Sequence, residues 1–173
     1  MVSNTPIHIT SVDDVLQLAL PDTSDYKVIK TTDLIEALRM ARRGGYIPHS
    51  IQQIHGTRHK AQIILVRENS RPASLISNDI GLNANRIGYL LALPTEIAQS
   101  IQYAPPTPLE VTIEMAVGRG YKPGEIVQTY RSSSDGHIRL YKDGNESARI
   151  VITNAGPIIV DKDFLIAHLD LAR

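Results

Sequence analysis

The chain has 173 residues, of which 42% are hydrophobic and 21% are charged, and these values are close to the averages of globular domains. Wholesale disorder and fibrous repeats are therefore excluded, and the absence of cysteine excludes disulfides, thiolate metal sites and cysteine nucleophiles. The formal net charge is zero, although the charges are unevenly distributed along the sequence. Because the N-terminus lacks a signal-peptide pattern and no window is apolar enough to span a bilayer, we expect a cytoplasmic protein without membrane association.

Two helices are expected in the first part of the chain. Ser11 can cap a first helix that runs to residue 19. Thr31 or Thr32 can cap a second helix, which the glycine pair beginning at Gly44 can end. The apolar positions that recur at helical spacing in the second helix are Leu34, Ile35, Leu38 and Ala41.

The longest clean alternation of apolar and polar residues lies at 109–117, and it predicts a central strand of an antiparallel sheet. Asp143 and Gly144 are typical of a hairpin turn. Residues 46–60 predict an irregular segment, and residues 86–93 fit either a strand or a helix. Further strands are expected at residues 7–10, 26–29, 61–67, 74–77, 125–131, 137–142, 148–153 and 157–160.

The remaining helices are expected at 94–103 and after Asp161, which can cap a helix at the C-terminal end. Together these elements predict an α+β fold, in which a mixed N-terminal α/β half packs with a C-terminal antiparallel β-meander closed by a C-terminal helix. The corresponding lobes are 1–103, which contains the basic segment 39–72, and 104–173. The same pattern also fits one continuous domain.

The glycines of VGRGYKPG, at 117–124, raise the question of a phosphate-binding loop. Their spacing matches neither phosphate-loop pattern, so a turn or bulge at the end of a sheet is favoured. The sequence VTIEMAVGRGY, at 111–121, resembles a short piece of the amino-terminal domain of the bacterial RNA polymerase alpha subunit. The likeness is confined to these residues, and we infer no function from it.

Three histidines, His49, His55 and His59, raise the question of a metal site. Gly56 disfavours a helix that would place two of them on one face, and no acidic residue lies among them. We therefore expect neither a metal nor another cofactor.

Two patterns raise the question of catalysis. The serines of SSSDG, at 132–136, are better explained by a hairpin loop than by a catalytic nucleophile, because no G-x-S-x-G pattern is present. Glu110 and Glu114 would share one face of the predicted strand, where they could act as an acid and a base or form a solvated outer face. The sequence therefore assigns no catalytic residue.

The uneven charge gives the main functional hypothesis. Residues 39–72 contain seven lysines and arginines against one glutamate, which predicts a surface that binds phosphates or an acidic protein. In the alternative interpretation, these cations are balanced by the carboxylates of residues 13–36. The candidate anion- or nucleic-acid-binding residues are Arg39, Arg42, Arg43, Arg58, His59 and Lys60.

The first interpretation is a non-catalytic binding module, an accessory protein with nucleic acid as its leading partner. A second is a structural or adaptor subunit of an assembly or homo-oligomer, in which a sheet edge or the proline-rich segment 105–108 supplies the contact. A third is a small enzyme, because a pocket assembled from distant residues leaves no sequence pattern.

Overall fold

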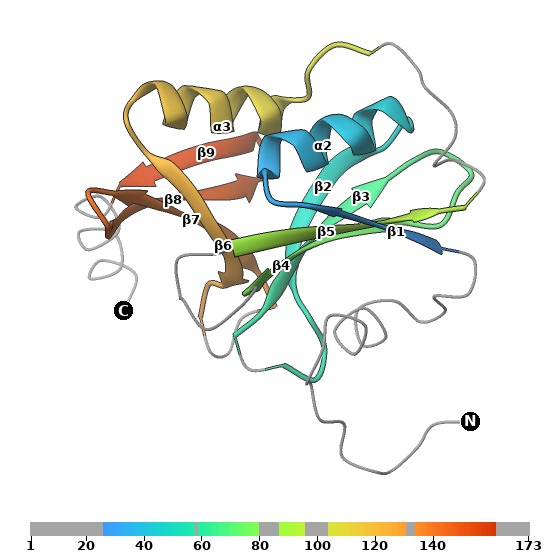
Figure 1. Cartoon of the computed structure of the whole chain (residues 1–173), viewed down its shortest axis with the longest axis horizontal. Coiled ribbons are helices and arrows are strands. Elements are labelled where there is room, and N and C mark those ends of the chain that lie inside the picture. Colours follow the sequence, from blue (N-terminus) through green and yellow to red (C-terminus); the bar gives the residue numbers. More distant parts are fainter. Residues whose placement is uncertain (1–25, 58, 80–86, 96–103, 131–133, 162–173) are drawn as a thin grey trace.

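The fold is α+β, with two helices and two antiparallel sheets in the described part of the chain (Figure 1). A computed structural model describes residues 26–57, 59–79, 87–95, 104–130 and 134–161. The predicted strand at 7–10, the helices at 11–19 and after Asp161, and most of the helix at 94–103 lie outside these ranges.

The first sheet has five strands in the order β1-β5-β4-β3-β2, and every neighbouring pair is antiparallel. These strands are β1 (Tyr26–Thr31), β2 (Ile47–Gln53), β3 (Ala61–Val66), β4 (Ala73–Asp79) and β5 (Ile87–Pro94). Three predicted strands are confirmed as β1, β3 and β4, and the ambiguous segment 86–93 is largely strand β5. The N-terminal half is thus an antiparallel meander to which β1 adds an edge.

The prediction of an irregular segment at 46–60 is wrong, because these residues contain β2. The pairing of β2 with β3 shifts register between Pro48 and Ser50. Such a bulge interrupts the period-2 pattern, and a proline is tolerated because β2 is an edge strand. Ile51 nevertheless points into the core.

Helix α2 (Leu34–Arg43) carries the chain from β1 at one edge of this sheet to β2 at the other. Its cap is Asp33 rather than Thr31 or Thr32, because the Asp33 carboxylate accepts a hydrogen bond from the N–H of Ile35 at 3.0 Å. Its end at Gly44 is confirmed. The buried residues of α2 are Leu34, Ala37, Leu38 and Ala41.

The second sheet is a four-stranded meander in the order β6-β7-β8-β9, as the sequence predicts. Its strands are β6 (Lys122–Gln128), β7 (Gly136–Lys142), β8 (Asn145–Thr153) and β9 (Gly156–Asp161). The predicted hairpin turn between β7 and β8 is confirmed, because Asp143 and Gly144 have φ values of 54° and 81°.

The central strand predicted at 109–117 is wrong, because this segment is the helix α3 (Pro108–Gly118). Thr107 and Glu110 form a capping box, in which each side chain accepts a hydrogen bond from the backbone N–H of the other. Proline at the first position also favours a helix start. The residues that α3 buries are Leu109, Glu110, Ile113 and Ala116, which recur at helical rather than strand spacing.

The two sheets meet at the end of the β2–β3 hairpin. The N–H of Gln53 donates to the carbonyl of Ser134 at 2.6 Å, and the N–H of Gln128 donates to the carbonyl of His59 at 2.8 Å. Gly136 lies so close to β3 that an added Cβ would be 2.5 Å from the Cβ of Ala61. One cluster of buried apolar side chains accordingly includes residues of both predicted lobes.

Candidate functional site

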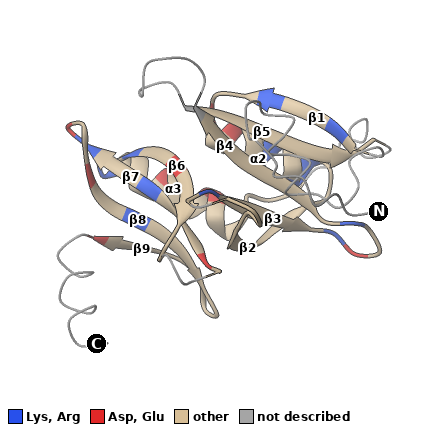
Figure 2. Ribbon diagram, turned by 90° about the horizontal axis from the view of Figure 1, so that it is seen from below, with Lys and Arg blue, Asp and Glu red and all other residues tan. Residues whose placement is uncertain are grey.

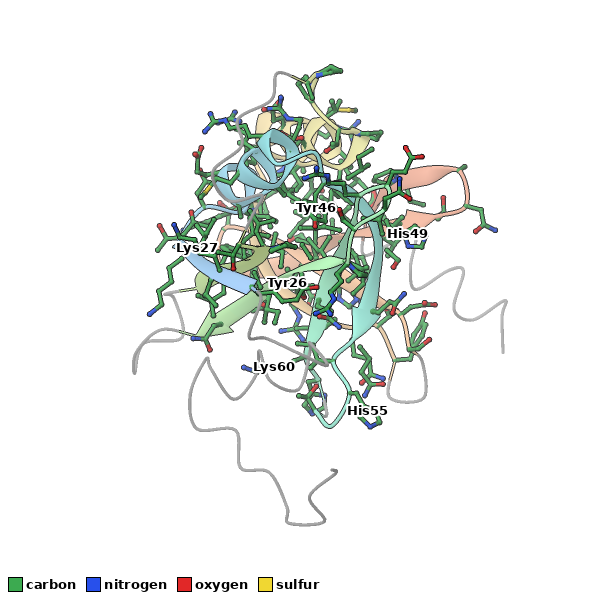
Figure 3. The ribbon with its side chains drawn as sticks, turned by 90° about the vertical axis from the view of Figure 1, so that its right-hand side faces the viewer. Tyr26, Lys27, Tyr46, His49, His55 and Lys60 are labelled. Carbon is green, nitrogen blue, oxygen red and sulfur yellow. The ribbon has the colours of Figure 1, made fainter. Side chains whose placement is uncertain are left out.

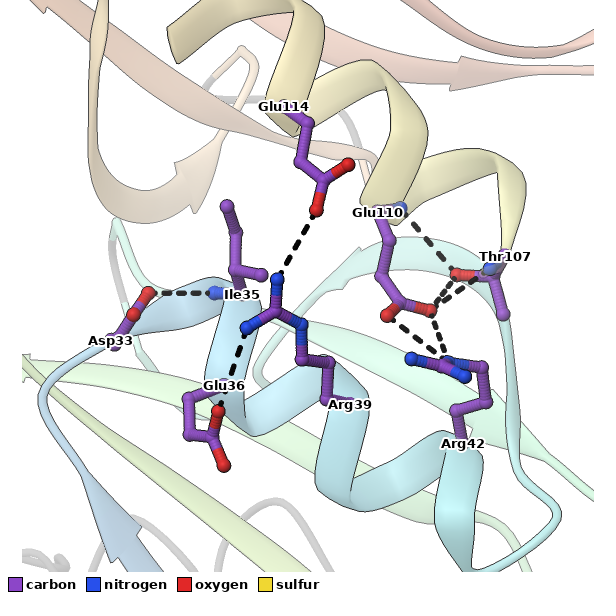
Figure 4. A network of polar contacts seen from close by, with 8 residues as sticks. All are labelled: Asp33, Ile35, Glu36, Arg39, Arg42, Thr107, Glu110 and Glu114. Atoms are coloured by element: carbon purple, nitrogen blue, oxygen red, sulfur yellow. Dashed lines mark hydrogen bonds and ion pairs between the residues drawn. The ribbon is translucent and has the colours of Figure 1, made fainter. Parts of the chain in front are cut away.

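Two arginines of the predicted basic segment are engaged by glutamates of α3 (Figure 4). The Arg42 Nε donates to both carboxylate oxygens of Glu110 at 3.1 Å, and the two side chains are 17% and 1% exposed. Arg42 also donates to the backbone carbonyl of Ala104. The Arg39 guanidinium donates to Glu114 at 3.3 Å. These contacts hold α2 against α3, so both guanidiniums already have anionic partners.

His59 and Lys60, of the other predicted site residues, lie apart from this pair. Arg43 is exposed in the last turn of α2, and Arg58 lies outside the described residues. His59 is exposed and Lys60 is half-buried at the end of the β2–β3 hairpin. Figures 1 and 3 place this end of the hairpin on the opposite side of the molecule from α2. The described candidates therefore do not form one surface.

The alternative interpretation, in which residues 13–36 balance the basic segment, has one contact within the described ranges. The Arg39 guanidinium lies 3.8 Å from the Glu36 carboxylate, one helical turn away on α2. Most of the balancing charge observed comes instead from α3, which the sequence interpretation treated as a strand.

The histidines do not gather into a metal site. The His49 Nδ1 lies 3.2 Å from the Ser50 hydroxyl, and both His55 and His59 are exposed. Within the described ranges, no group of three or more histidine, aspartate and glutamate side chains has the geometry to hold a metal ion.

A pocket of about 940 Å³ opens between the second sheet and the end of the β2–β3 hairpin, and we call it the junction pocket. His59 and Lys60 reach it from the hairpin, so two of the predicted site residues are part of it. The other lining residues are Ser77, Gly120, Lys122, Pro123, Glu125, Ile126, Val127, Arg139, Tyr141, Asp143 and Gly144.

One wall of the junction pocket is a bulge of β6, which the first sheet anchors. The pairing of β6 with β7 shifts register within this bulge. The Ser77 hydroxyl on β4 accepts a hydrogen bond from the N–H of Ile126 at 2.9 Å, and the Tyr89 hydroxyl on β5 donates to the carbonyl of Gly124. Burial, followed by the charge of Glu125, raises the pKa of Tyr89, so this hydroxyl stays a donor.

The bulge also fixes the side chain of Tyr141. A Cβ added at Gly124 would lie 2.3 Å from the Tyr141 ring, so the ring packs directly on the β6 backbone. The Tyr141 hydroxyl donates to the Glu125 carboxylate at 2.7 Å, and the Arg139 guanidinium donates to the same carboxylate at 3.1 Å. Burial and the bond to Glu125 raise the pKa of Tyr141. Glu125 is therefore neutralised by partners inside the pocket.

Two cations of the junction pocket lack such a partner. Within the described ranges, neither Lys60 nor Lys122 has an ammonium group within ion-pair distance of a carboxylate. Asp143 lies at the exposed turn of the pocket wall. A pocket with two uncompensated lysines can attract and bind an anion.

Sequence reasoning missed most of this pocket. Lys122, Glu125, Arg139 and Tyr141 were not among the candidates, although Arg139 and Tyr141 alternate with buried Leu140 in a correctly predicted strand. That alternation indicates a shared polar face. The glycines at 117–124 favoured a turn or bulge near this point, but the sequence did not show that the bulge brings Glu125 to this face.

Searches of protein-family models, of curated proteins and of solved structures give no match to this chain. Neither helix that the structure describes is long and apolar enough to cross a membrane.

Proposed function

We propose that the protein is a non-catalytic binding module whose junction pocket takes a phosphate-bearing ligand, with nucleic acid as the leading partner. The observation that carries this proposal is the pair of lysines, Lys60 and Lys122, which line one pocket without a carboxylate partner in the described structure. Lysine ammonium groups bind phosphates as point charges. The proposal keeps the partner expected from the sequence and two of the predicted site residues, His59 and Lys60, and it leaves out the arginines of α2.

The size of the pocket supports a ligand larger than a free ion. A volume of about 940 Å³ is at the upper end of the usual range for small-molecule sites. Tyr141 and Val127 supply apolar surface beside the cations. A phosphate with an attached organic group, such as a nucleotide unit, therefore suits this pocket better than phosphate alone.

The hydrogen bonding of Ser77, a nearly buried serine in the pocket wall, favours a binding role over a catalytic one. The Ser77 hydroxyl accepts the N–H of Ile126 at 2.9 Å and is used to hold the β6 bulge. Within the described ranges it makes no hydrogen bond to a histidine, lysine or carboxylate that could act as a base. Ser77 thus serves as a structural residue in this proposal.

Fluorescence anisotropy with a labelled single-stranded oligonucleotide, at two salt concentrations, tests the proposal. The variant carries Lys60→Gln and Lys122→Gln together, and the matched control carries Lys27→Gln and Lys30→Gln on edge strand β1, which removes the same charge elsewhere. Loss of two phosphate contacts should lower the salt slope by about 1.4 units for a single strand. The control should keep the wild-type slope.

Equal weakening in both variants would mean that only net charge matters, and the junction pocket would then not be the site. Absence of binding by the wild-type protein, to the oligonucleotide and to a mononucleotide alike, would also reject the proposal. Binding of the mononucleotide alone would keep the pocket and replace nucleic acid by a small ligand.

The alternative of an assembly subunit stays a prediction. The described edge strands are β1 and β2 in the first sheet and β6 and β9 in the second. Light scattering over a concentration series measures self-association, and a monomer at every concentration would remove the homo-oligomer.

A further inference from the structure

Two arginines stand side by side on the face of the second sheet that continues from the junction pocket. Arg139 on β7 lies directly opposite Arg149 on β8 in the strand register. Figure 2 shows the basic positions of these two strands next to each other. Like charges that face each other across a strand pair are destabilising unless an anion compensates them.

The hydrogen bonding of this pair is incomplete. The Arg149 side chain is 19% exposed, and its Nε is buried without a hydrogen-bond partner. The Nε of Arg139 is also buried without a partner, although its Nη1 donates to Glu125. Buried donors of this kind are rare in native proteins, because the lost hydration is not replaced. Each guanidinium therefore has one buried N–H group, at Nε, that lacks an acceptor.

Besides Glu125, which pairs with Arg139, a second carboxylate lies near both arginines but accepts a hydrogen bond from neither. The Glu146 oxygens are 3.7 Å from the Arg139 Nε and 3.9 Å from an Arg149 Nη, beyond hydrogen-bond distance. Glu146 is 37% exposed, so it can turn toward solvent. His137 lies beside it and stays neutral, because burial and both arginines lower its pKa to about 3.

We infer that Arg139 and Arg149 form a second phosphate subsite, continuous with the junction pocket, and that Glu146 occupies its place until the ligand displaces it. Arg139 lines the pocket and also faces Arg149, so it connects the two subsites. The guanidinium fork suits a phosphate group better than one distant carboxylate does. This inference rests on the proposed function and narrows the ligand to one with at least two phosphates, either a nucleoside diphosphate or successive phosphates of a strand.

Isothermal titration calorimetry with inorganic phosphate and with pyrophosphate tests the second subsite on the full chain. The wild-type protein should bind pyrophosphate about tenfold more tightly than phosphate, which is the worth of one charge-assisted contact. Arg149→Gln should remove this preference and leave phosphate affinity unchanged. Glu146→Gln should strengthen pyrophosphate binding by up to about fivefold, because the competing carboxylate loses its charge.

The matched control is Glu114→Gln on α3, where a glutamate 50% exposed pairs with Arg39 at 3.3 Å. This control removes the same charge away from the subsite and should leave both affinities at the wild-type values. Arg149→Lys keeps the charge without the fork and should show a preference between those of the wild type and Arg149→Gln. The thermal melt of each variant verifies that it is folded.

Repeating the titration with a nucleoside diphosphate and with a short single-stranded oligonucleotide shows whether the two phosphates belong to a small ligand or to a strand. A loss in Arg149→Gln that is confined to the nucleoside diphosphate identifies a small ligand, whereas a loss with the oligonucleotide identifies a strand. Either loss supports the subsite.

A pyrophosphate preference that survives Arg149→Gln would overturn the second subsite, and so would an unchanged affinity in Glu146→Gln. The variant with both lysines replaced distinguishes a failure of the second subsite from a failure of the proposed function. If Lys60→Gln with Lys122→Gln abolishes phosphate binding while Arg149→Gln changes nothing, the pocket stands and the subsite falls. If pyrophosphate binding depends on Arg149 alone, the subsite stands and the lysine pocket falls.

Discussion

Replacing Arg42 by glutamine should destabilise the protein strongly, although the sequence placed this arginine on a binding surface. The change removes two hydrogen bonds of 3.1 Å to a glutamate that is 1% exposed, together with the bond to Ala104. Breaking a buried ion pair by removing one partner costs about 3–5 kcal/mol. Glu110 keeps its bonds from Thr107 at 2.9 and 2.8 Å, so we expect the lower end, about 3 kcal/mol.

Circular dichroism melts and urea titrations measure this loss. At this chain length, about 3 kcal/mol corresponds to a drop in Tm of about 6–12 °C. Arg43→Gln is the matched control, because Arg43 is the next residue, is exposed, and should change stability by less than about 0.5 kcal/mol. Equal melting of the two variants would refute the argument that Arg42 is a structural residue. If Arg42→Gln melts lower, as expected, a double-mutant cycle with Glu110→Gln isolates the coupling between the two side chains.

Three further outcomes are expected. Gly124→Ala should destabilise by about 1–3 kcal/mol in urea titrations and weaken ligand binding, because the new Cβ would meet the Tyr141 ring at 2.3 Å; wild-type behaviour would contradict this packing. Gly144→Ala should cost about 1–2 kcal/mol in the same assay, since φ is +81° there, and no loss would mean that the turn adopts another form. The pKa of His137 is about 3 in the folded state and near 6.5 in the unfolded state. Between these two pH values only the unfolded state takes up the proton, so the free energy of unfolding is unaffected above pH 6.5 and falls by up to about 5 kcal/mol as the pH drops toward 3. The free energy of unfolding of His137→Asn, measured between pH 7 and pH 5, should therefore fall less steeply than that of the wild type, and parallel curves would contradict the shift.

The sequence predicted the strands of the second sheet well because their signals are local. Alternation and the turn at Asp143 and Gly144 act within a few residues of each other. The helix α3 was missed for a reason that is also local. Leu109, Ile113 and Val117 fit a period of 2 and a period of about 4 at once, so the pattern alone cannot separate strand from helix.

The distinguishing signal in α3 was present before the apolar run. Thr107 and Glu110 form a capping box and Pro108 takes the first helical position, and this local chemistry outweighs the β-propensity of Val111 and Thr112. With α3 read as a helix, Glu110 and Glu114 would also have been placed one turn apart, facing a neighbouring helix.

The proposed binding site was less predictable than the fold. The charge of residues 39–72 singled out Lys60, which lines the junction pocket, but it could not show that Arg42 meets Glu110, a contact between residues far apart in the chain. The Arg139–Arg149 pair depends on strand register, which a single sequence specifies only when turn and bulge positions are known.

The place of β1 in the first sheet has a consequence for how the chain folds. Strands β2 to β5 follow one another as neighbours, whereas β1 pairs only with β5, and this pairing joins Tyr26 to Pro94 across most of the N-terminal half. Closing so long a loop loses chain entropy before any ladder bond forms, and non-local pairing of this kind slows folding. The meander can therefore form first, with β1 added at its edge as a late step. In native-state hydrogen exchange, the amides of β1 should open at lower free energy than those of β3 and β4, which are paired on both sides.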